Sequence, residues 1–226
     1  MSLNLTVKSR AVFLNGNIND SSAAAVITQL LFLEQESPYT PIRLHINSGG
    51  GKVQAGFAIH DTMQALTSPV HTICMGHCSS MAAVLLATGA EGHREAMPNA
   101  RILIHQPTRV SGRGNAREFS IQAESIEKTR LRLTELLARR SGRPVSEIEE
   151  LIQYDHVCDS SEALALGLID RVVEPGSLLP SAGQSPATAE AEAAAPSSTP
   201  APPAANPVAK GESAAPKSAR SATQAP

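Results

Sequence analysis

Three separated segments of the 226-residue sequence carry side chains that together could perform nucleophilic catalysis. Three glycines occupy positions 49–51, two adjacent serines follow at Ser79 and Ser80, and His105 comes later in the chain. A serine hydroxyl becomes a nucleophile when a histidine accepts its proton, and the tetrahedral intermediate needs N–H donors for its oxyanion. This order of residue types predicts acyl-transfer chemistry.

Each segment also has an ordinary structural interpretation. The glycines alone could form a flexible turn, a serine could cap a helix, and a histidine at the end of a buried strand is commonly structural. Chemistry alone does not choose between the two serines. A triad also needs an acid that orients the histidine, and Asp155 and Asp159 both stay open for that role.

Alternating short strands and helices are expected to position these residues. The hydrophobic pattern predicts strands over 11–14, 42–46, 70–74, 101–104 and 169–173, with a turn over 76–79. It predicts helices from Asp20 or Ser21 to about 35, after the glycines to about 66, and over 81–88, 116–140, 145–153 and 161–166. Repeated strand–helix units predict an α/β fold with a largely parallel sheet, whose functional residues gather where strands lead into helices.

Composition and charge exclude several classes of function. Lys and Arg number 19 against 21 Asp and Glu, so no basic surface for nucleic acid or an acidic membrane is expected. The sequence has no Trp and only 3% aromatic residues, which disfavours a base-stacking module. We therefore expect neither nucleic acid nor a membrane among the partners.

The cysteines and the N-terminal segment indicate the compartment. Cys74, Cys78 and Cys158 are an odd number without C-x-x-C spacing, which predicts reduced thiols and no metal site. Residues 1–15 lack the pattern of a signal peptide, and no apolar stretch is long enough to span a membrane. A cytoplasmic location is the expectation.

The composition changes near Pro175. Residues 176–226 contain nine of the 16 prolines and no Ile, Phe, Tyr, Met, Cys or His. Such a segment buries too little apolar surface to offset its ordering entropy. We therefore expect a working domain over 1–175 and a disordered tail rich in Ala, Pro and Ser over 176–226, which is either inert or recruits a partner.

Several ordered motifs resemble the proteolytic subunits of the Clp protease family (ClpP). They lie in 47–63, 72–81 and 98–107, and the similarity runs from about 10 to 174. The resemblance implies Ser80 as nucleophile rather than Ser79, His105 as base and Asp155 as acid. It also implies oxyanion donors at the backbone N–H groups of Gly51 and Met81.

The resemblance further implies a crotonase-like spiral of ββα units, with a protruding handle helix from Ala116. The implied activity is that of a serine endopeptidase that needs no metal or organic cofactor. It would cleave unfolded polypeptides for protein quality control inside two stacked seven-membered rings, a tetradecamer, fed by an ATP-dependent unfoldase. The rings could be homo-oligomers or mixed rings with a paralogue.

The sequence departs from the family pattern at several positions. Arg43, His45 and Glu95 replace aromatic residues in the pocket where a Clp-type AAA+ ATPase docks, and charges there must be desolvated. Gly49 replaces a proline of the glycine-rich loop, which adds backbone entropy. Tyr154 replaces the basic residue that usually precedes the acid, and the segment before the first strand is short for axial pore loops.

Three other functions are alternatives. A catalytically weak ring subunit that modulates an active paralogue would fit the altered docking pocket. A crotonase-type acyl-CoA enzyme is disfavoured because that chemistry needs no nucleophilic serine. An enzyme of the signal-peptide-peptidase type would need a catalytic lysine, and Lys52 is the only lysine near a motif.

Overall fold

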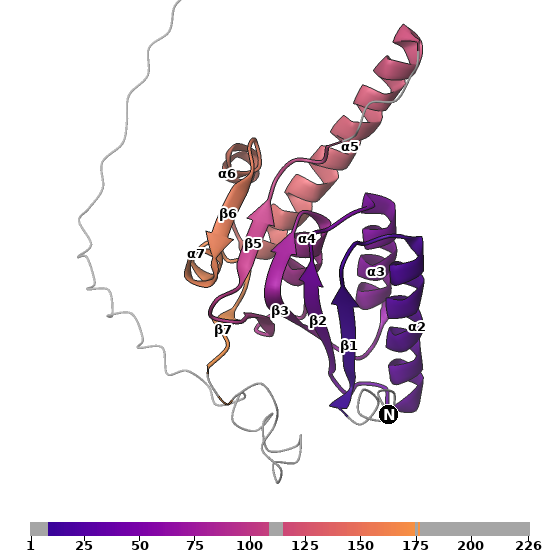
Figure 1. The fold of residues 1–226 in the computed structure, drawn as a ribbon, viewed down its shortest axis with the longest axis vertical. Coiled ribbons are helices and arrows are strands. Elements are labelled where there is room, and N and C mark those ends of the chain that lie inside the picture. The colour runs from indigo at the N-terminus through magenta and orange to yellow at the C-terminus, as the bar shows by residue number, and fades with distance from the viewer. Residues whose placement is uncertain (1–8, 109–114, 175, 177–226) are drawn as a thin grey trace, which may run out of the picture. The chain divides into compact units, whose positions relative to one another are not determined.

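A computed structural model describes residues 9–108, 115–174 and 176 of the chain. The predicted tail over 176–226 lies outside these described residues, except for Gly176. The described part has the expected α/β architecture, with a largely parallel sheet and helices (Figure 1).

Five strands of the sheet follow one another in the order β1-β2-β3-β4-β7, and all these neighbours run parallel. β5 pairs in parallel with β3, and β6 pairs antiparallel with β5. The strands are β1 (Ala11–Asn15), β2 (Ile42–Ser48), β3 (Val70–Ser79), β4 (Arg94–Ala96), β5 (Arg101–Ile104), β6 (His156–Asp159) and β7 (Arg171–Val172).

The helices of the described residues are α2 (Asp20–Glu36), α3 (Val53–Ala65), α4 (Met81–Ala87), α5 (Ala116–Ser141), α6 (Val145–Leu151) and α7 (Ser160–Ala165). Figure 1 shows α2 and α3 together on one side of the sheet. Alternate residues of the first two strands point into the core on that side, among them Val12, Leu14, Leu44 and Ile46, which are at most 1% exposed. This alternation is the pattern from which the strands were predicted.

The N-terminal cap of α2 was predicted wrongly. Asn19, rather than Asp20 or Ser21, is the capping residue, and its side chain accepts hydrogen bonds from the N–H groups of Ser21 and Ser22. The Ser22 hydroxyl in turn accepts a hydrogen bond from the Asn19 N–H. Asn, Asp and Ser cap helices about equally well, so residue type alone could not place this boundary.

The predicted turn over 76–79 is also wrong, because β3 continues to Ser79. The strand contains a β-bulge instead. Cys74 pairs with Ile46 and Cys78 pairs with Ser48, so an advance of four residues along β3 corresponds to an advance of two residues along β2. Gly76 has a φ of 94°, a conformation that glycine adopts readily. Beyond this bulge β3 exchanges its neighbour β4 for β5.

Two strands, β4 and β6, were not predicted. β4 is three residues long and contains Arg94 and Glu95, both of which are buried. Arg94 is satisfied by Asp170 and by the carbonyl oxygens of Arg140 and Gly167. These partners come from distant parts of the sequence, so no local pattern marks the strand.

Helix α5 is the long helix that the hydrophobic pattern predicted over 116–140, and it extends well beyond the sheet, as the resemblance implied (Figure 1). It starts in a capping box between Asn115 and Glu118. Its C-terminal half is anchored by Leu133, Leu136 and Leu137, which are buried, whereas Phe119 nearer its start is 43% exposed. The helix is therefore attached at one end only.

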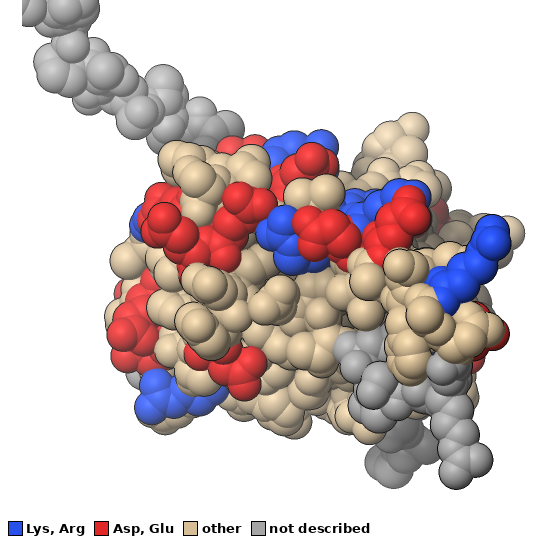
Figure 2. Space-filling model, turned by 90° about the horizontal axis from the view of Figure 1, so that it is seen from above, with Lys and Arg blue, Asp and Glu red and all other residues tan. Residues whose placement is uncertain are grey.

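The face seen from above is uncharged at its centre, and acidic and basic side chains lie next to one another at its border (Figure 2). No stripe of a single sign, such as binds a nucleic-acid backbone, is visible on this face. Among the described helices, none has the length and apolar composition that crossing a bilayer requires.

Candidate active site

Ser80 lies at the junction between β3 and α4 in an unusual backbone conformation. Its φ is 56° and its ψ −125°, a region that non-glycine residues rarely adopt. The Ser80 N–H donates to the Leu103 carbonyl at 2.8 Å, and the Ser80 carbonyl accepts from the N–H of Ala83 at 3.0 Å. The pairing of β3 with β5 thus holds a conformation that costs on the order of 1–3 kcal/mol.

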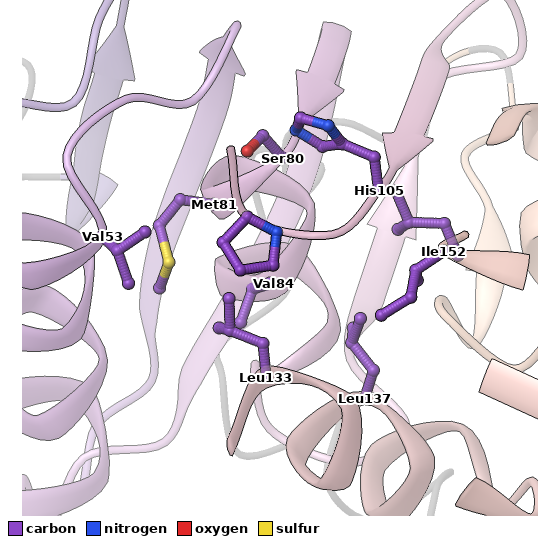
Figure 3. A pocket seen from close by; sticks show the side chains of 10 residues that line it. Val53, Ser80, Met81, Val84, His105, Leu133, Leu137 and Ile152 are labelled. Carbon is purple, nitrogen blue, oxygen red and sulfur yellow. The ribbon is translucent and has the colours of Figure 1, made fainter. Parts of the chain in front are cut away.

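Ser80 and His105 line the same pocket (Figure 3). Their side chains lie at one end of it, while Val84, Leu133 and Leu137 lie at the other end. Ser79, by contrast, is the last residue of β3 and does not line this pocket. The structure therefore separates the two serines that residue chemistry left equivalent.

The rest of the pocket is mostly apolar. Its other lining residues are Val53, Met81, Ile104, Pro107 and Ile152. The enclosed volume is about 20 Å³, which is room for about one water molecule. A space of this size is too small for a substrate side chain, but its apolar lining limits the access of water to Ser80 and His105.

Of the two acids that were left open, Asp155 is the one that approaches His105. Its Oδ1 lies 3.4 Å from His105 Nδ1. Asp159 instead caps α7, because its side chain accepts a hydrogen bond from the Glu162 N–H at 2.9 Å. The Asp155 side chain is 72% exposed, whereas that of His105 is 19% exposed, so water competes for this carboxylate.

Gln106 joins the segments of His105 and Asp155, a role that the sequence analysis missed. Its backbone N–H donates to the Ile152 carbonyl at 2.9 Å, and its side-chain amide donates to the Gln153 carbonyl at 3.1 Å. These bonds bring the residue after His105 to the segment directly before Asp155. A polar residue next to a candidate base was the available signal.

The glycine-rich loop passes directly beside Ser80. A Cβ atom on Gly50 would lie 2.8 Å from the Ser80 Cβ and 2.6 Å from the Ser79 carbonyl oxygen. One on Gly51 would lie 2.2 Å from the Ile18 carbonyl oxygen. Both glycines have a positive φ, at 87° and 149°. The close approach therefore requires glycine at both positions.

The N–H groups of Gly51 and Met81 are available as donors. The Gly50 carbonyl accepts from the Ile18 N–H at 2.8 Å, and the two ends of a trans peptide point in opposite directions, so the Gly51 N–H points away from Ile18. No hydrogen bond within the described residues uses either N–H. Met81 N lies 3.2 Å from where a Gly50 Cβ would be, so both groups border the same junction.

A cysteine thiol near the site does not compete with Ser80. Cys78 is fully buried beside Cys74, and burial raises the pKa of its thiol well above the usual range. A protonated thiol is a poor nucleophile. Within the described residues, no three His, Cys, Asp or Glu side chains are grouped as a metal ion would need.

The chain matches the model of a known protein family. A family model described as Clp protease matches residues 2–176, more than three quarters of the chain. The match contains Ser80, His105, Asp155 and the glycine-rich loop, and it ends where the composition changes. It confirms the resemblance that the motifs showed.

Proposed function

The chain belongs to the Clp protease family, and on that premise we propose that it is a serine endopeptidase that cleaves unfolded polypeptides. The geometric observation behind the proposal is that Ser80 and His105 share one pocket. The strained backbone of Ser80 supports the same assignment, and so does the identity of the neighbouring acid, because Asp155 lies next to His105 whereas Asp159 caps α7.

The proposed reaction has two steps. His105 takes the proton of the Ser80 hydroxyl as the oxygen attacks a peptide carbonyl, and then gives it to the leaving amine. Asp155 orients the imidazole and stabilises its protonated form. The N–H groups of Gly51 and Met81 bind the oxyanion, and one such donor is typically worth about 3 kcal/mol. Water, with His105 again as base, hydrolyses the acyl-enzyme.

We further propose assembly into two stacked seven-membered rings, fed by an ATP-dependent unfoldase in the cytoplasm. The exposed apolar side chains of Phe119, Ile121 and Leu131 support an interface along α5, because a neighbouring subunit that covered them would bury apolar surface. We also propose that residues 1–175 form the peptidase domain and that residues 176–226 form a separate tail.

A specific observation favours a second candidate, a weakly active ring subunit that modulates an active paralogue. The distance of 3.4 Å between His105 and Asp155 is long for a hydrogen bond, and Asp155 is mostly exposed. A histidine that is loosely oriented is a poorer base. Assembly with a paralogue would then be needed for full activity.

Labelling with a fluorophosphonate distinguishes the two candidates. The purified full-length protein is labelled, digested for peptide mapping and weighed by native mass spectrometry. We expect the label on Ser80 in a particle of fourteen subunits, with no label in Ser80→Ala and full label in Ser79→Ala. An unlabelled particle of that size would support the modulatory subunit and contradict the peptidase.

If native mass spectrometry finds a particle of fewer than fourteen subunits, the labelling is repeated after the ring subunits of a paralogue are added. Labelling of Ser80 in the resulting mixed ring supports the peptidase, and an absence of label there contradicts it. The Ser79→Ala protein is the matched control in each case, because Ser79 precedes the nucleophile but does not line the pocket.

A further inference from the structure

Ser48 is a buried polar residue directly before the glycine-rich loop, and the catalytic steps described above give it no role. It is the last residue of β2, and none of its surface is exposed. Its hydroxyl oxygen accepts a hydrogen bond from the backbone N–H of Gly50 at 3.1 Å. Gly50 is buried as well, so this bond satisfies a donor that water does not reach.

The β-bulge of β3 brings this serine and the loop after it level with the nucleophile. Ser48 pairs with Cys78, on the far side of the bulge. Two residues further along each segment are Gly50 and Ser80, whose Cβ positions would lie only 2.8 Å apart. Without the two extra residues of the bulge, Gly50 would instead lie level with Cys78. The bulge therefore sets the register at which the loop meets Ser80.

The glycine-rich loop needs restraints from its neighbours. Three consecutive glycines over 49–51 have wide conformational freedom and contribute no side chain that could hold the loop in place. Packing prevents Gly50 from moving closer to Ser80, because the two are already in contact. Packing of this kind does not oppose a movement away from Ser80, whereas hydrogen bonds to the neighbouring segments do.

Hydrogen bonds hold Gly50 at both its N–H and its carbonyl. The N–H donates to the Ser48 hydroxyl, and the carbonyl accepts from the Ile18 N–H at 2.8 Å. The Ile18 carbonyl in turn accepts from the Lys52 N–H at 2.8 Å. The Gly50 carbonyl belongs to the same planar peptide unit as the Gly51 N–H. Fixing Gly50 therefore fixes the direction in which the proposed oxyanion donor points.

The contact through Ser48 depends on its side chain. The bonds through Ile18 join backbone atoms, whereas the bond to the Gly50 N–H needs a hydroxyl at position 48. Alanine there would leave the buried Gly50 N–H without this acceptor, and a buried donor without a partner is costly. The loop would then move to find another acceptor, and the exposed Gly49 gives it the freedom to do so.

We propose that Ser48 is a positioning residue, whose hydroxyl fixes the Gly50 amide so that the Gly51 N–H is aimed at the oxyanion before the substrate binds. The inference rests on the proposed function, and Ser48 acts through the loop without touching the substrate. An oxyanion donor contributes mainly in the transition state, where the carbonyl oxygen becomes charged. Loss of the Ser48 hydroxyl should therefore lower kcat and leave KM nearly unchanged.

Steady-state cleavage of a fluorogenic peptide by the full-length protein tests this role. We expect Ser48→Ala to lower kcat at least about tenfold and to leave KM within about threefold. Ser48→Thr keeps the hydroxyl and should bring kcat back to within about threefold of the unmodified protein. Ser160→Ala is the matched control. It removes another buried hydroxyl, which donates to the Met97 carbonyl at 2.7 Å, and should leave kcat unchanged.

A further variant covers the case in which threonine does not fit at the buried position. Ser48→Cys differs from serine in the acceptor atom, and sulfur is a weak acceptor. Its kcat should lie between those of Ser48→Ala and the unmodified protein. Native mass and thermal unfolding verify that each variant is folded and assembled as the unmodified protein is.

Hydrogen exchange followed by mass spectrometry reports on the loop independently of activity. The measurement uses Ser80→Ala, which lacks the proposed nucleophile, as the background. We expect the amides of residues 47–52 to exchange faster when Ser48→Ala is added to this background. Adding Ser160→Ala should leave the exchange of the same segment unchanged.

Three results would overturn the inference. They are a normal kcat in assembled Ser48→Ala, an equal loss of kcat in Ser48→Ala and Ser160→Ala, and unchanged exchange of residues 47–52 in the double variant. Failure of the proposed function gives a different result. If the unmodified, assembled protein neither cleaves the peptide nor takes up fluorophosphonate on Ser80, the peptidase assignment is contradicted, and the catalytic role of Ser48 with it.

Discussion

The backbone of Gly50 passes so close to Ser80 that a Cβ atom there would lie 2.8 Å from the serine Cβ. Contacts this short do not occur between real Cβ atoms, so the glycine-rich loop and the β3–α4 junction fit together only if position 50 is glycine. The neighbouring Gly49 differs, since a Cβ there meets only His77 Nε2, at 3.8 Å.

This contrast predicts different effects of two alanine substitutions. Gly50→Ala forces the loop away from Ser80 and displaces the Gly51 N–H, so kcat/KM for a fluorogenic peptide should fall at least about 100-fold. Gly49→Ala is the matched control and should stay within about threefold. Native mass verifies that both assemble alike, and equal activity of the two variants would contradict the placement of the loop.

Asp155 and Asp159 should be separable by function. Asp155→Asn removes the charge beside His105 and should lower kcat at least about 100-fold, with little change in thermal stability. Asp159→Asn changes the cap of α7 and should cost no more than about 1 kcal/mol of folding free energy, with activity retained. If Asp155→Asn kept its activity and Asp159→Asn lost it, Asp159 rather than Asp155 would be the acid that orients His105.

Gln106 should act as a positioning residue through its bond to Gln153. Gln106→Ala removes the side-chain amide but keeps the backbone bond to Ile152, so His105 should be held less firmly. We expect kcat to fall about tenfold while KM and fluorophosphonate labelling of Ser80 in the assembled particle change little. Gln106→Glu lacks the amide donor and should not restore kcat; a Gln106→Ala protein with normal kcat would contradict this role.

The ion pair between Arg94 and Asp170 should make stability depend on pH. Burial alone would raise the pKa of Asp170, but the hydrogen bonds from Arg94 outweigh burial and hold this pKa below its ordinary value. The folded protein therefore binds fewer protons than the unfolded chain near pH 4, and this stabilisation is lost as the pH falls from about 5 through the native pKa.

Asp170→Asn tests this linkage. The substitution should cost about 3 kcal/mol at pH 7, because it leaves the buried Arg94 without a counter-charge. The cost should shrink as the pH falls below 4, when the native carboxyl also becomes protonated. Urea unfolding at a series of pH values measures the cost at pH 7 and its change with pH. A cost that is independent of pH would contradict a stabilising role for the charge of Asp170.

His71 predicts a dependence in a different pH range. Its pKa is about 4 in the folded protein, below the ordinary value near 6.5, so the unfolded chain binds the additional proton between these values. Stability is therefore lost as the pH falls from about 6.5 to 4. When the pH falls from 8 to 4.5, the unmodified protein should lose more stability than His71→Gln, which has no imidazole to protonate. Urea unfolding of both proteins at the two pH values measures the losses, and equal losses would contradict the lowered pKa of His71.

Local sequence patterns were sufficient for much of the fold. Helix α4 was predicted from its unbroken apolar run, and all seven of its residues are buried. Helix α5 was predicted from spaced apolar residues and begins and ends close to the expected positions. These features depend on neighbours within one or two turns, so the sequence contains the information directly.

Other features depend on residues that are far apart in the chain. β3 continues through Gly76 because β5 pairs with its second half, and that partner lies more than twenty residues away. β4 exists despite its charged residues because Asp170 reaches Arg94 from 76 positions further on. The hydrophobic pattern of one segment does not reveal a partner that is distant in the sequence. For this reason β4 was missed and β3 was predicted to end too early.

The candidate site divides in the same way. Residue types and their order alone identified a serine, a histidine and a glycine-rich loop, because nucleophilic catalysis needs those groups in any fold. Residue chemistry left Asp155 and Asp159 open, and the resemblance implied Asp155. Only the tertiary structure shows the physical difference between them: Asp155 lies 3.4 Å from His105, whereas the Asp159 side chain caps α7. The reactivity of a group depends on its own side chain, whereas the distance between two groups that are far apart in the sequence depends on how the whole chain packs.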